Sequence, residues 1–87
     1  MTVRILKYQF VDCARIDIPR DAVIRHVANQ NGQLTVWAEV HDDTRPKPLV
    51  RLVAIVTGDS VPDGFAYIGT AMFNNGSFIL HVYRRSI

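Results

Sequence analysis

Cysteine is almost absent from this chain of 87 residues, because Cys13 is the only one. A single cysteine forms neither an intramolecular disulfide nor a thiolate metal cluster, which excludes a small secreted fold stabilised by disulfides. Long apolar runs are also missing, since no segment approaches the roughly 20 residues of a membrane-spanning helix and no signal-peptide core is visible in residues 1–10. These absences predict a soluble protein of the cytoplasm.

An excess of either charge is lacking as well, since ten basic residues face eight acidic ones and the net charge is +2. So small a charge does not by itself predict a nucleic-acid partner. In contrast, 48% of the residues are hydrophobic and 21% are charged, which are the proportions of a folded globular protein. We therefore expect residues 1–87 to form a single β domain with one small core.

Asn31-Gly32 is the strongest turn signal in the sequence, because a type I′ hairpin turn requires positive φ at both central residues. The turn predicts a hairpin over residues 23–40 with a defined register. On a mostly aliphatic face, expected to be core, the register pairs Asn29 with Leu34, Val27 with Val36, Arg25 with Ala38 and Val23 with Val40. On the opposite face it pairs Ala28 with Thr35, His26 with Trp37 and Ile24 with Glu39.

Residues 21–32 also fit a helix. Asp21 would cap its first turn and Gly32 would follow its last, with an apolar stripe formed by Val23, Ile24, Val27 and Ala28. The β-branched residues of this segment, and the tight turn before a clear strand, favour the hairpin.

Alternation of apolar and polar residues predicts further strands at residues 6–10, 14–18 and 34–41. A bulge or burial on both sides of the strand is expected near Ile5, where the alternation changes phase. The almost continuous apolar run 49–56 predicts a central strand covered on both faces, with Arg51 as its one charge. Between Gly58 and Gly64, a run of turn-forming residues predicts a shaped loop.

A second hairpin is predicted around Asn75-Gly76, joining residues 66–73 to residues 78–84. Its register pairs Phe73 with Phe78, Met72 with Ile79, Ala71 with Leu80, Thr70 with His81, Gly69 with Val82 and Ile68 with Tyr83. Both faces of this hairpin are substantially apolar, which favours burial of one of them in a homodimer or higher homo-oligomer. Altogether the sequence predicts an all-β fold, a small antiparallel β-sandwich or barrel of about seven short strands built on two Asn-Gly hairpins.

Three histidines and one cysteine raise the question of a metal site, but their positions match no ligand spacing such as HxxxH or CxxC. No serine, cysteine or histidine stands in a pattern typical of a nucleophile with its base. The sequence therefore predicts a protein that is not an enzyme and has no metal and no cofactor. Cys13 is expected to act as a small buried hydrophobe.

The strongest candidate for a partner-binding surface is the second face of the first hairpin. There Ile24, His26, Trp37 and Glu39 would form a patch with an aromatic centre, and protein interfaces are enriched in such anchors. The alternative is that Trp37 belongs to an ordinary core.

Arginine provides a weaker candidate, because its planar fork suits phosphate. Arg25, Arg51, Arg84 and Arg85 could converge on a phosphodiester or another ligand, or they could be scattered, solvated charges. Lys7-Tyr8 and Tyr83-Arg84 place rings beside cations, as on oligonucleotide-binding barrels, but two such pairs are a slight pattern. Nucleic acid is therefore not expected as a partner.

Several short blocks along the chain resemble, in their order and spacing, a family of short phage and prophage proteins of unassigned function. The likeness extends from about residue 6 to residue 83, and its blocks are Gln30-Asn31-Gly32-Gln33, Val36-Trp37-Ala38, Val56-Thr57-Gly58 with Val61-Pro62-Asp63, Tyr67-Ile68-Gly69-Thr70 and His81-Val82. The end of the chain departs from the pattern, since Arg84 and Arg85 stand where an acidic residue is expected. The resemblance implies a phage origin and an accessory role, and it supplies no catalytic residues.

Together these observations predict a non-catalytic phage or prophage accessory protein that acts in the cytoplasm of the bacterial host by binding a host macromolecule. An inhibitor of a host defence complex is the sharpest version. Two alternatives are a homo-oligomer that sequesters a nucleotide signal between its subunits, and a small virion or morphogenetic component. No membrane partner is expected.

Overall fold

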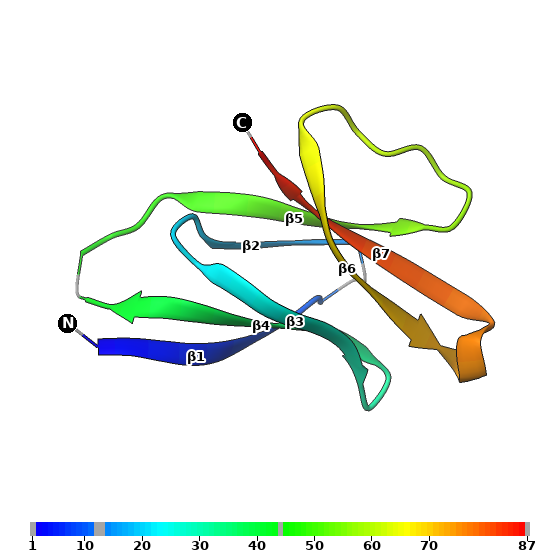
Figure 1. The fold of residues 1–87 in the computed structure, drawn as a ribbon, viewed down its shortest axis with the longest axis horizontal. Coiled ribbons are helices and arrows are strands. Elements are labelled where there is room, and N and C mark those ends of the chain that lie inside the picture. Colours follow the sequence, from blue (N-terminus) through cyan, green and yellow to red (C-terminus); the bar gives the residue numbers. More distant parts are fainter. Residues whose placement is uncertain (1, 12–13, 44, 87) are drawn as a thin grey trace.

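The structure, a computed structural model, describes residues 2–11, 14–43 and 45–86. Seven strands form two antiparallel sheets, with the order β1-β4-β3 in one and β2-β5-β7-β6 in the other (Figure 1). The strands are β1 (Thr2–Gln9), β2 (Arg15–Pro19), β3 (Val23–Gln30), β4 (Gln33–Asp42), β5 (Leu49–Val56), β6 (Phe65–Phe73) and β7 (Phe78–Arg85). One 3₁₀ turn, η1 (Asn74–Gly76), joins β6 to β7, and no α-helix occurs in the described residues. The predicted all-β sandwich of seven strands is confirmed.

The first hairpin forms as β3 and β4, so the helix considered for residues 21–32 is wrong. Asn31 and Gly32 have φ values of 53° and 86°, as a type I′ turn requires, and the Gly32 amide donates a 2.8 Å hydrogen bond to the Asn29 side chain. The predicted register is confirmed from Gln30 opposite Gln33 to His26 opposite Trp37.

Beyond His26 the register shifts, because a β-bulge at Arg25 adds one residue to β3. Ile24 therefore lies opposite Ala38 and Val23 lies opposite Glu39. The predicted pairs of Arg25 with Ala38 and Val23 with Val40 are wrong. Since side chains alternate between the faces of a strand, the extra residue turns Ile24 toward the core and Val23 toward solvent.

The second hairpin shows the same combination of a correct turn and a displaced register. Asn74, Asn75 and Gly76 all have positive φ in the connection between β6 and β7. The predicted pairs are confirmed from Phe73 with Phe78 to Gly69 with Val82. A bulge then follows at Ile68, so Tyr67 rather than Ile68 lies opposite Tyr83.

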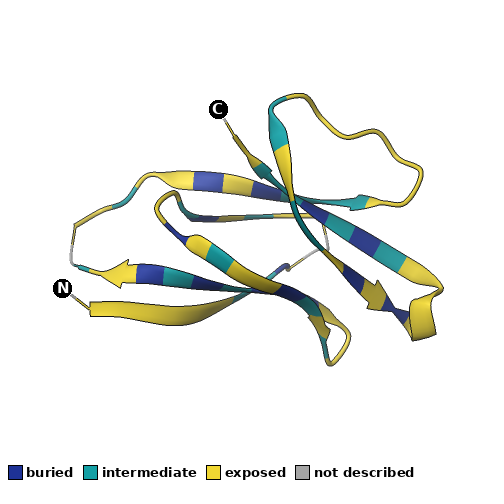
Figure 2. Cartoon of the chain, viewed as in Figure 1, coloured by how far each residue is buried: buried dark blue, intermediate teal, exposed yellow. Residues whose placement is uncertain are grey.

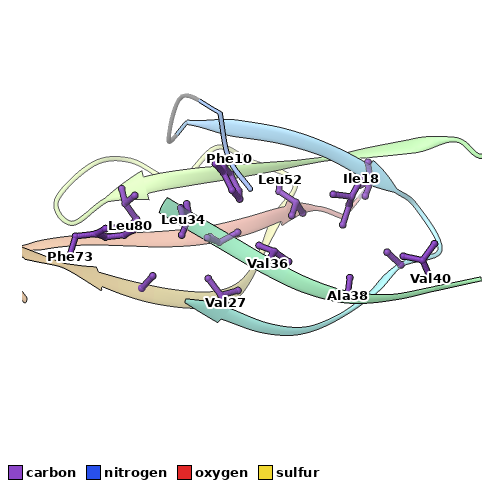
Figure 3. Packing of buried hydrophobic residues seen from close by; sticks show 14 residues of the cluster. Phe10, Ile18, Val27, Leu34, Val36, Ala38, Val40, Leu52, Phe73 and Leu80 are labelled. Atoms are coloured by element: carbon purple, nitrogen blue, oxygen red, sulfur yellow. The ribbon is translucent and has the colours of Figure 1, made fainter. Parts of the chain in front are cut away.

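The core lies between the two sheets (Figure 3). Its largest fully buried side chains are Phe10, Ile18, Leu34, Leu52, Leu80, Val36 and Val82. The sheets approach closely where β3 crosses β6, since a Cβ added at Gly69 would lie 2.9 Å from Cγ2 of Val27. The Asn29 side chain also donates a 3.1 Å hydrogen bond to the Met72 carbonyl across this contact. Close packing of β3 on β6 therefore requires glycine at position 69.

Two predictions about burial are wrong, and in both cases the strand is more exposed than predicted. The β1–β4 register runs without a shift from Thr2 to Gln9, so the bulge expected near Ile5 does not occur, and the strand is exposed along most of its length (Figure 2). β5 lies inside its sheet as predicted, but only one of its faces is buried. Val50 and Leu52 point into the core, whereas Arg51 lies on the open face.

Candidate binding surfaces

The outer face of the three-stranded sheet carries the tryptophan. β4 lies in the middle of this sheet, so Trp37 is flanked by Lys7 of β1 and His26 of β3. The His26 and Trp37 rings form a tilted pair, with centroids 5.7 Å apart and planes inclined at 38°. His26 is exposed and Trp37 is half-buried. The structure thus brings the two predicted rings together on a surface.

Glu39 occupies the next row of the same face. Its carboxylate accepts two hydrogen bonds from Arg25, of 2.9 Å from Nε and 3.0 Å from Nη2. These bonds hold the pKa of Glu39 below its usual range and raise the pKa of Arg25. Ile5 and Val23 flank Glu39, with 56% and 47% of their surfaces exposed. We call the surface formed by Ile5, Lys7, Val23, His26, Trp37 and Glu39 the tryptophan face.

Ile24, the fourth residue predicted for this surface, is missing from it. The bulge at Arg25 turns its side chain inward, where it packs against the core. Val23 takes its place beside Glu39. A regular register would have kept Ile24 outside, so the error follows directly from the bulge.

The free edge of β1 adjoins the tryptophan face. The Phe10 amide donates a 3.0 Å hydrogen bond to the Leu34 carbonyl, and bonded and non-bonded pairs alternate along an antiparallel ladder. Continued toward Thr2, this alternation directs the backbone N–H and C=O groups of Val3, Ile5 and Lys7 away from β4. Among the described residues, no strand pairs with this edge.

The three other sheet edges are each modified in a way that discourages further pairing. β3 is bulged at Arg25 and packs on β6, which is itself bulged at Ile68. β2 is only five residues long and ends at Pro19. By contrast, β1 is eight residues long, has no proline and keeps a regular register. It is therefore the edge best suited to accept another strand.

The four arginines predicted to bind phosphate do not converge on a single site. Arg25 is bonded to Glu39 on the three-stranded sheet, as described above. Arg51 donates a 2.6 Å hydrogen bond to Asp17, which holds the pKa of that carboxyl below its usual range. Arg84 donates to the backbone carbonyls of Ala22 and Arg20, and so ties the end of β7 to the turn between β2 and β3.

Arg51 and Arg85 of this predicted set do come together, and Arg20 joins them. The three arginines line a shallow hollow of about 260 Å³ beside Asp17, at one end of the four-stranded sheet. Arg20, Arg84 and Arg85 line a neighbouring hollow of about 190 Å³. Sequence reasoning missed Arg20, because it lies 65 positions from Arg85 in the chain and only the fold makes the two neighbours.

Aromatic side chains continue from these arginines across the outer face of the four-stranded sheet. Tyr67 lies opposite Tyr83 and Phe65 lies opposite Arg85. The two tyrosine rings meet edge to face with centroids 5.6 Å apart, and the Arg85 guanidinium lies 5.7 Å from the centre of the Phe65 ring. We call the surface formed by Arg51, Phe65, Tyr67, Tyr83 and Arg85 the tyrosine face.

Sequence reasoning missed Tyr67 because the predicted register paired Ile68 with Tyr83 and so placed Tyr67 on the opposite face of the hairpin. The bulge at Ile68 reverses this assignment and brings Tyr67 beside Tyr83. Tyr67-Ile68-Gly69 itself held a signal, since a glycine inside a strand often accompanies a bulge.

Metal binding depends on whether histidines and acidic residues cluster in the parts of the chain that the structure describes. Within those ranges, no group of three or more His, Cys, Asp or Glu side chains could hold a metal ion. His81 is held on both ring nitrogens, by Thr57 at 2.8 Å and by Thr70 at 3.1 Å. Cys13, expected to be a buried hydrophobe, lies outside the described residues. None of the described helices is long and apolar enough to cross a membrane.

These two antiparallel sheets with open outer faces place the chain among small all-β domains. It belongs to the family described as a domain of unknown function, DUF7352, which matches residues 1–87. No curated protein and no solved structure matches the chain. Its function must therefore be argued from its surfaces.

Proposed function

We propose that this protein is a non-catalytic binding protein that attaches to another protein through the tryptophan face and the adjoining edge of β1. A phage or prophage accessory protein that inhibits a host defence complex is the specific form of this proposal. The phage origin is supported by the order and spacing of the blocks that include Val36-Trp37-Ala38 and Tyr67-Ile68-Gly69.

The bare edge of β1 is the observation that carries the proposal. An extended segment of a partner would add a strand there and bond to the outward backbone groups of Val3, Ile5 and Lys7. Its side chains would then lie in line with Ile5 and close to Trp37 on the outer face. Exposed apolar side chains beside a row of unpaired backbone groups are a liability for an isolated protein. A partner strand would bury these side chains and pair these backbone groups.

The first experiment identifies the partner and then measures its affinity. The tagged protein is used to isolate a complex from bacteria carrying defined defence systems, and binding to the purified component is measured by titration calorimetry. Trp37→Ala should weaken binding by roughly 30-fold or more, since a central aromatic anchor contributes about 2 kcal/mol. Met72→Ala is the matched control, because Met72 is 63% exposed on the opposite sheet.

Ile5→Pro tests the contribution of the β1 backbone edge to binding separately from that of the side chains around it. Proline removes the outward N–H at position 5, and it is tolerated at an edge whose N–H faces solvent. We expect Ile5→Pro to abolish binding while circular dichroism stays unchanged. If both Trp37→Ala and Ile5→Pro bind the partner as tightly as the unmodified chain, the proposed surface is wrong.

A homo-oligomer is the second candidate, and the same edge supports it. Two copies of β1 paired antiparallel about Ile5 would place Val3 opposite Lys7 and leave no two like charges directly opposite. Light scattering on the free protein decides between the two candidates. A stable dimer that Ile5→Pro converts to a monomer would show that the edge is occupied by a second copy, and would contradict binding of a host protein there.

A further inference from the structure

We infer that the tyrosine face is a binding site for single-stranded nucleic acid, whose bases stack on Tyr67 and Tyr83 and whose phosphates are held by Arg51 and Arg85. This site lies on the other sheet from the tryptophan face and does not depend on the function proposed above.

The rings on this face are available to a ligand. Tyr67 lies in the middle of a strand, where its side chain is 58% exposed, and Tyr83 and Phe65 beside it are half-buried. Val53 lies opposite Tyr83 on the adjacent strand, β5, and adds an apolar side chain to this face. Aromatic rings on an open four-stranded antiparallel sheet provide the stacking platform that single-stranded bases use.

The Tyr67 ring is also held in place before any ligand binds. Its hydroxyl lies 2.6 Å from the Thr70 hydroxyl, which contacts Nδ1 of His81 at 3.1 Å. On the other side of that imidazole, Nε2 lies 2.8 Å from the Thr57 hydroxyl. A ring fixed by a chain of hydrogen bonds loses little conformational freedom when a base stacks on it, which lowers the cost of binding.

Positive charge concentrates at the same end of the sheet. Arg51 and Arg85 extend from neighbouring strands, and Arg20 joins them around the hollow of about 260 Å³. Among the described residues that line this hollow, Asp17, which is bonded to Arg51, is the one carboxylate. Three guanidinium groups thus gather at this corner, and arginine forks bind phosphate oxygens in pairs.

The distances suit a short stretch of a single strand. Adjacent strands lie about 4.8 Å apart, and residues two apart on one strand are separated by about 7 Å. The two tyrosines and the two arginines therefore lie within reach of about two or three successive nucleotides, which is the number of bases that the ring-bearing sheets of RNA-binding domains stack. A duplex hides its base faces within its own stack, so it would lose the contacts to Tyr67 and Tyr83 and keep only those to arginine.

Fluorescence anisotropy with labelled dT12 and U12 tests the inference. We expect saturable binding of at least one of these strands at low salt, and binding at least tenfold weaker to a duplex of the same length. Tyr67→Ala should weaken binding about tenfold, as expected for the loss of one stacked base. Tyr67→Phe keeps the ring but loses the hydroxyl bond to Thr70, so its affinity should lie between those of the unmodified chain and Tyr67→Ala. Met72→Ala, outside the tyrosine face, provides the matched control.

Three outcomes would overturn the inference. They are no anisotropy change with either strand at low salt, equal binding of the duplex, and unchanged binding by Tyr67→Ala whose circular dichroism matches that of the unmodified chain. Trp37→Ala tests whether oligonucleotide binding is independent of the protein binding proposed for the tryptophan face. If Trp37→Ala loses the protein partner but retains the oligonucleotide, the two surfaces act independently, and a failure of one proposal leaves the other standing.

Discussion

The two outer faces of this small sandwich carry similar residue types in different arrangements. On the tryptophan face, Arg25 is paired with Glu39, and Lys7 donates a hydrogen bond to the neutral Gln30 side chain. On the tyrosine face, Arg51 is paired with Asp17 of β2, and Arg85 lies on the other side of Arg51, beside the Phe65 ring. The comparison teaches that a net charge of +2 says little about where cations gather, because the fold brings Arg20, Arg51 and Arg85 to one hollow.

Both faces depend on a β-bulge, and this is what makes the comparison informative. The bulge at Arg25 brings that side chain to Glu39 and sends Ile24 inward. The bulge at Ile68 brings Tyr67 to Tyr83. In each hairpin, one inserted residue exchanges the faces for the segment beyond it.

The largest expected effect is a loss of stability caused by a substitution at the close contact between β3 and β6. Gly69→Val should lower the free energy of unfolding by about 3 kcal/mol, because the added side chain collides with Val27 at the β3–β6 contact. Urea denaturation measures the change. Ala66→Val, at an exposed position of the same strand, should remain within about 0.5 kcal/mol of the unmodified chain. Equal effects of the two substitutions would show that Gly69 is not a packing residue.

A substitution in the turn of the first hairpin should destabilise the sheet that carries the tryptophan face before it affects the other sheet. Gly32→Ala should destabilise the protein by about 1–2 kcal/mol, since φ at this position is 86° and a Cβ opposes the left-handed conformation. Hydrogen exchange should accelerate first in β3 and β4. Asn31→Gly is the matched control, because glycine accepts the same turn and the loss should be only a few tenths of a kcal/mol. Uniform acceleration across both sheets would contradict local opening.

Salt should distinguish the ligands of the two faces. If two phosphates contact Arg51 and Arg85, the logarithm of the oligonucleotide affinity should fall with the logarithm of salt with a slope of about −1.4, or about sevenfold between 50 and 200 mM. Arg51→Gln should reduce the slope by about 0.7. Binding of a protein partner at the tryptophan face should change much less. A salt-independent oligonucleotide affinity would exclude phosphate contacts.

The smallest expected effect is a pH dependence from the ion pair on the tryptophan face. Arg25 holds the pKa of Glu39 below its usual 4.5, so this pair stabilises the folded state above that pH and ceases to do so as pH falls through the lowered pKa. Arg25→Gln should therefore lower the melting temperature slightly at pH 7 and have no effect at pH 2. A difference that grows toward acidic pH would have the wrong sign and contradict this linkage.

Much of the fold could be predicted from local residue patterns. Asn31-Gly32 and Asn75-Gly76 were correct turn signals, because few residues accept positive φ. Alternation around Trp37 correctly paired that ring with His26 on the face opposite the aliphatic one, but it left open whether that face was core or surface. The apolar run of β5 was misleading, since Val53 and Ile55 lie on the open face and hydrophobicity alone does not tell which faces are covered.

The candidate site was less predictable, for a different physical reason. His26, Trp37 and Glu39 lie together as predicted, because they are close in one hairpin and its turn sets their pairing. Among the arginines, Arg51 and Arg85 of the predicted set lie in the hollow, whereas Arg25 lies on the other sheet and Arg20, which the prediction lacked, comes from a distant segment. A bulge or a contact between distant strands leaves no periodic pattern in the sequence.

By itself, the sequence determined which segments are extended, where the two hairpins turn and which rings and charges are present, because φ preferences and alternation act between near neighbours. Tertiary structure alone decided that β3 packs on β6, that β1 keeps a bare edge and that three arginines meet beside two tyrosines. The physical reason is that packing two twisted sheets against each other selects the bulges, and each bulge decides which side chains face solvent.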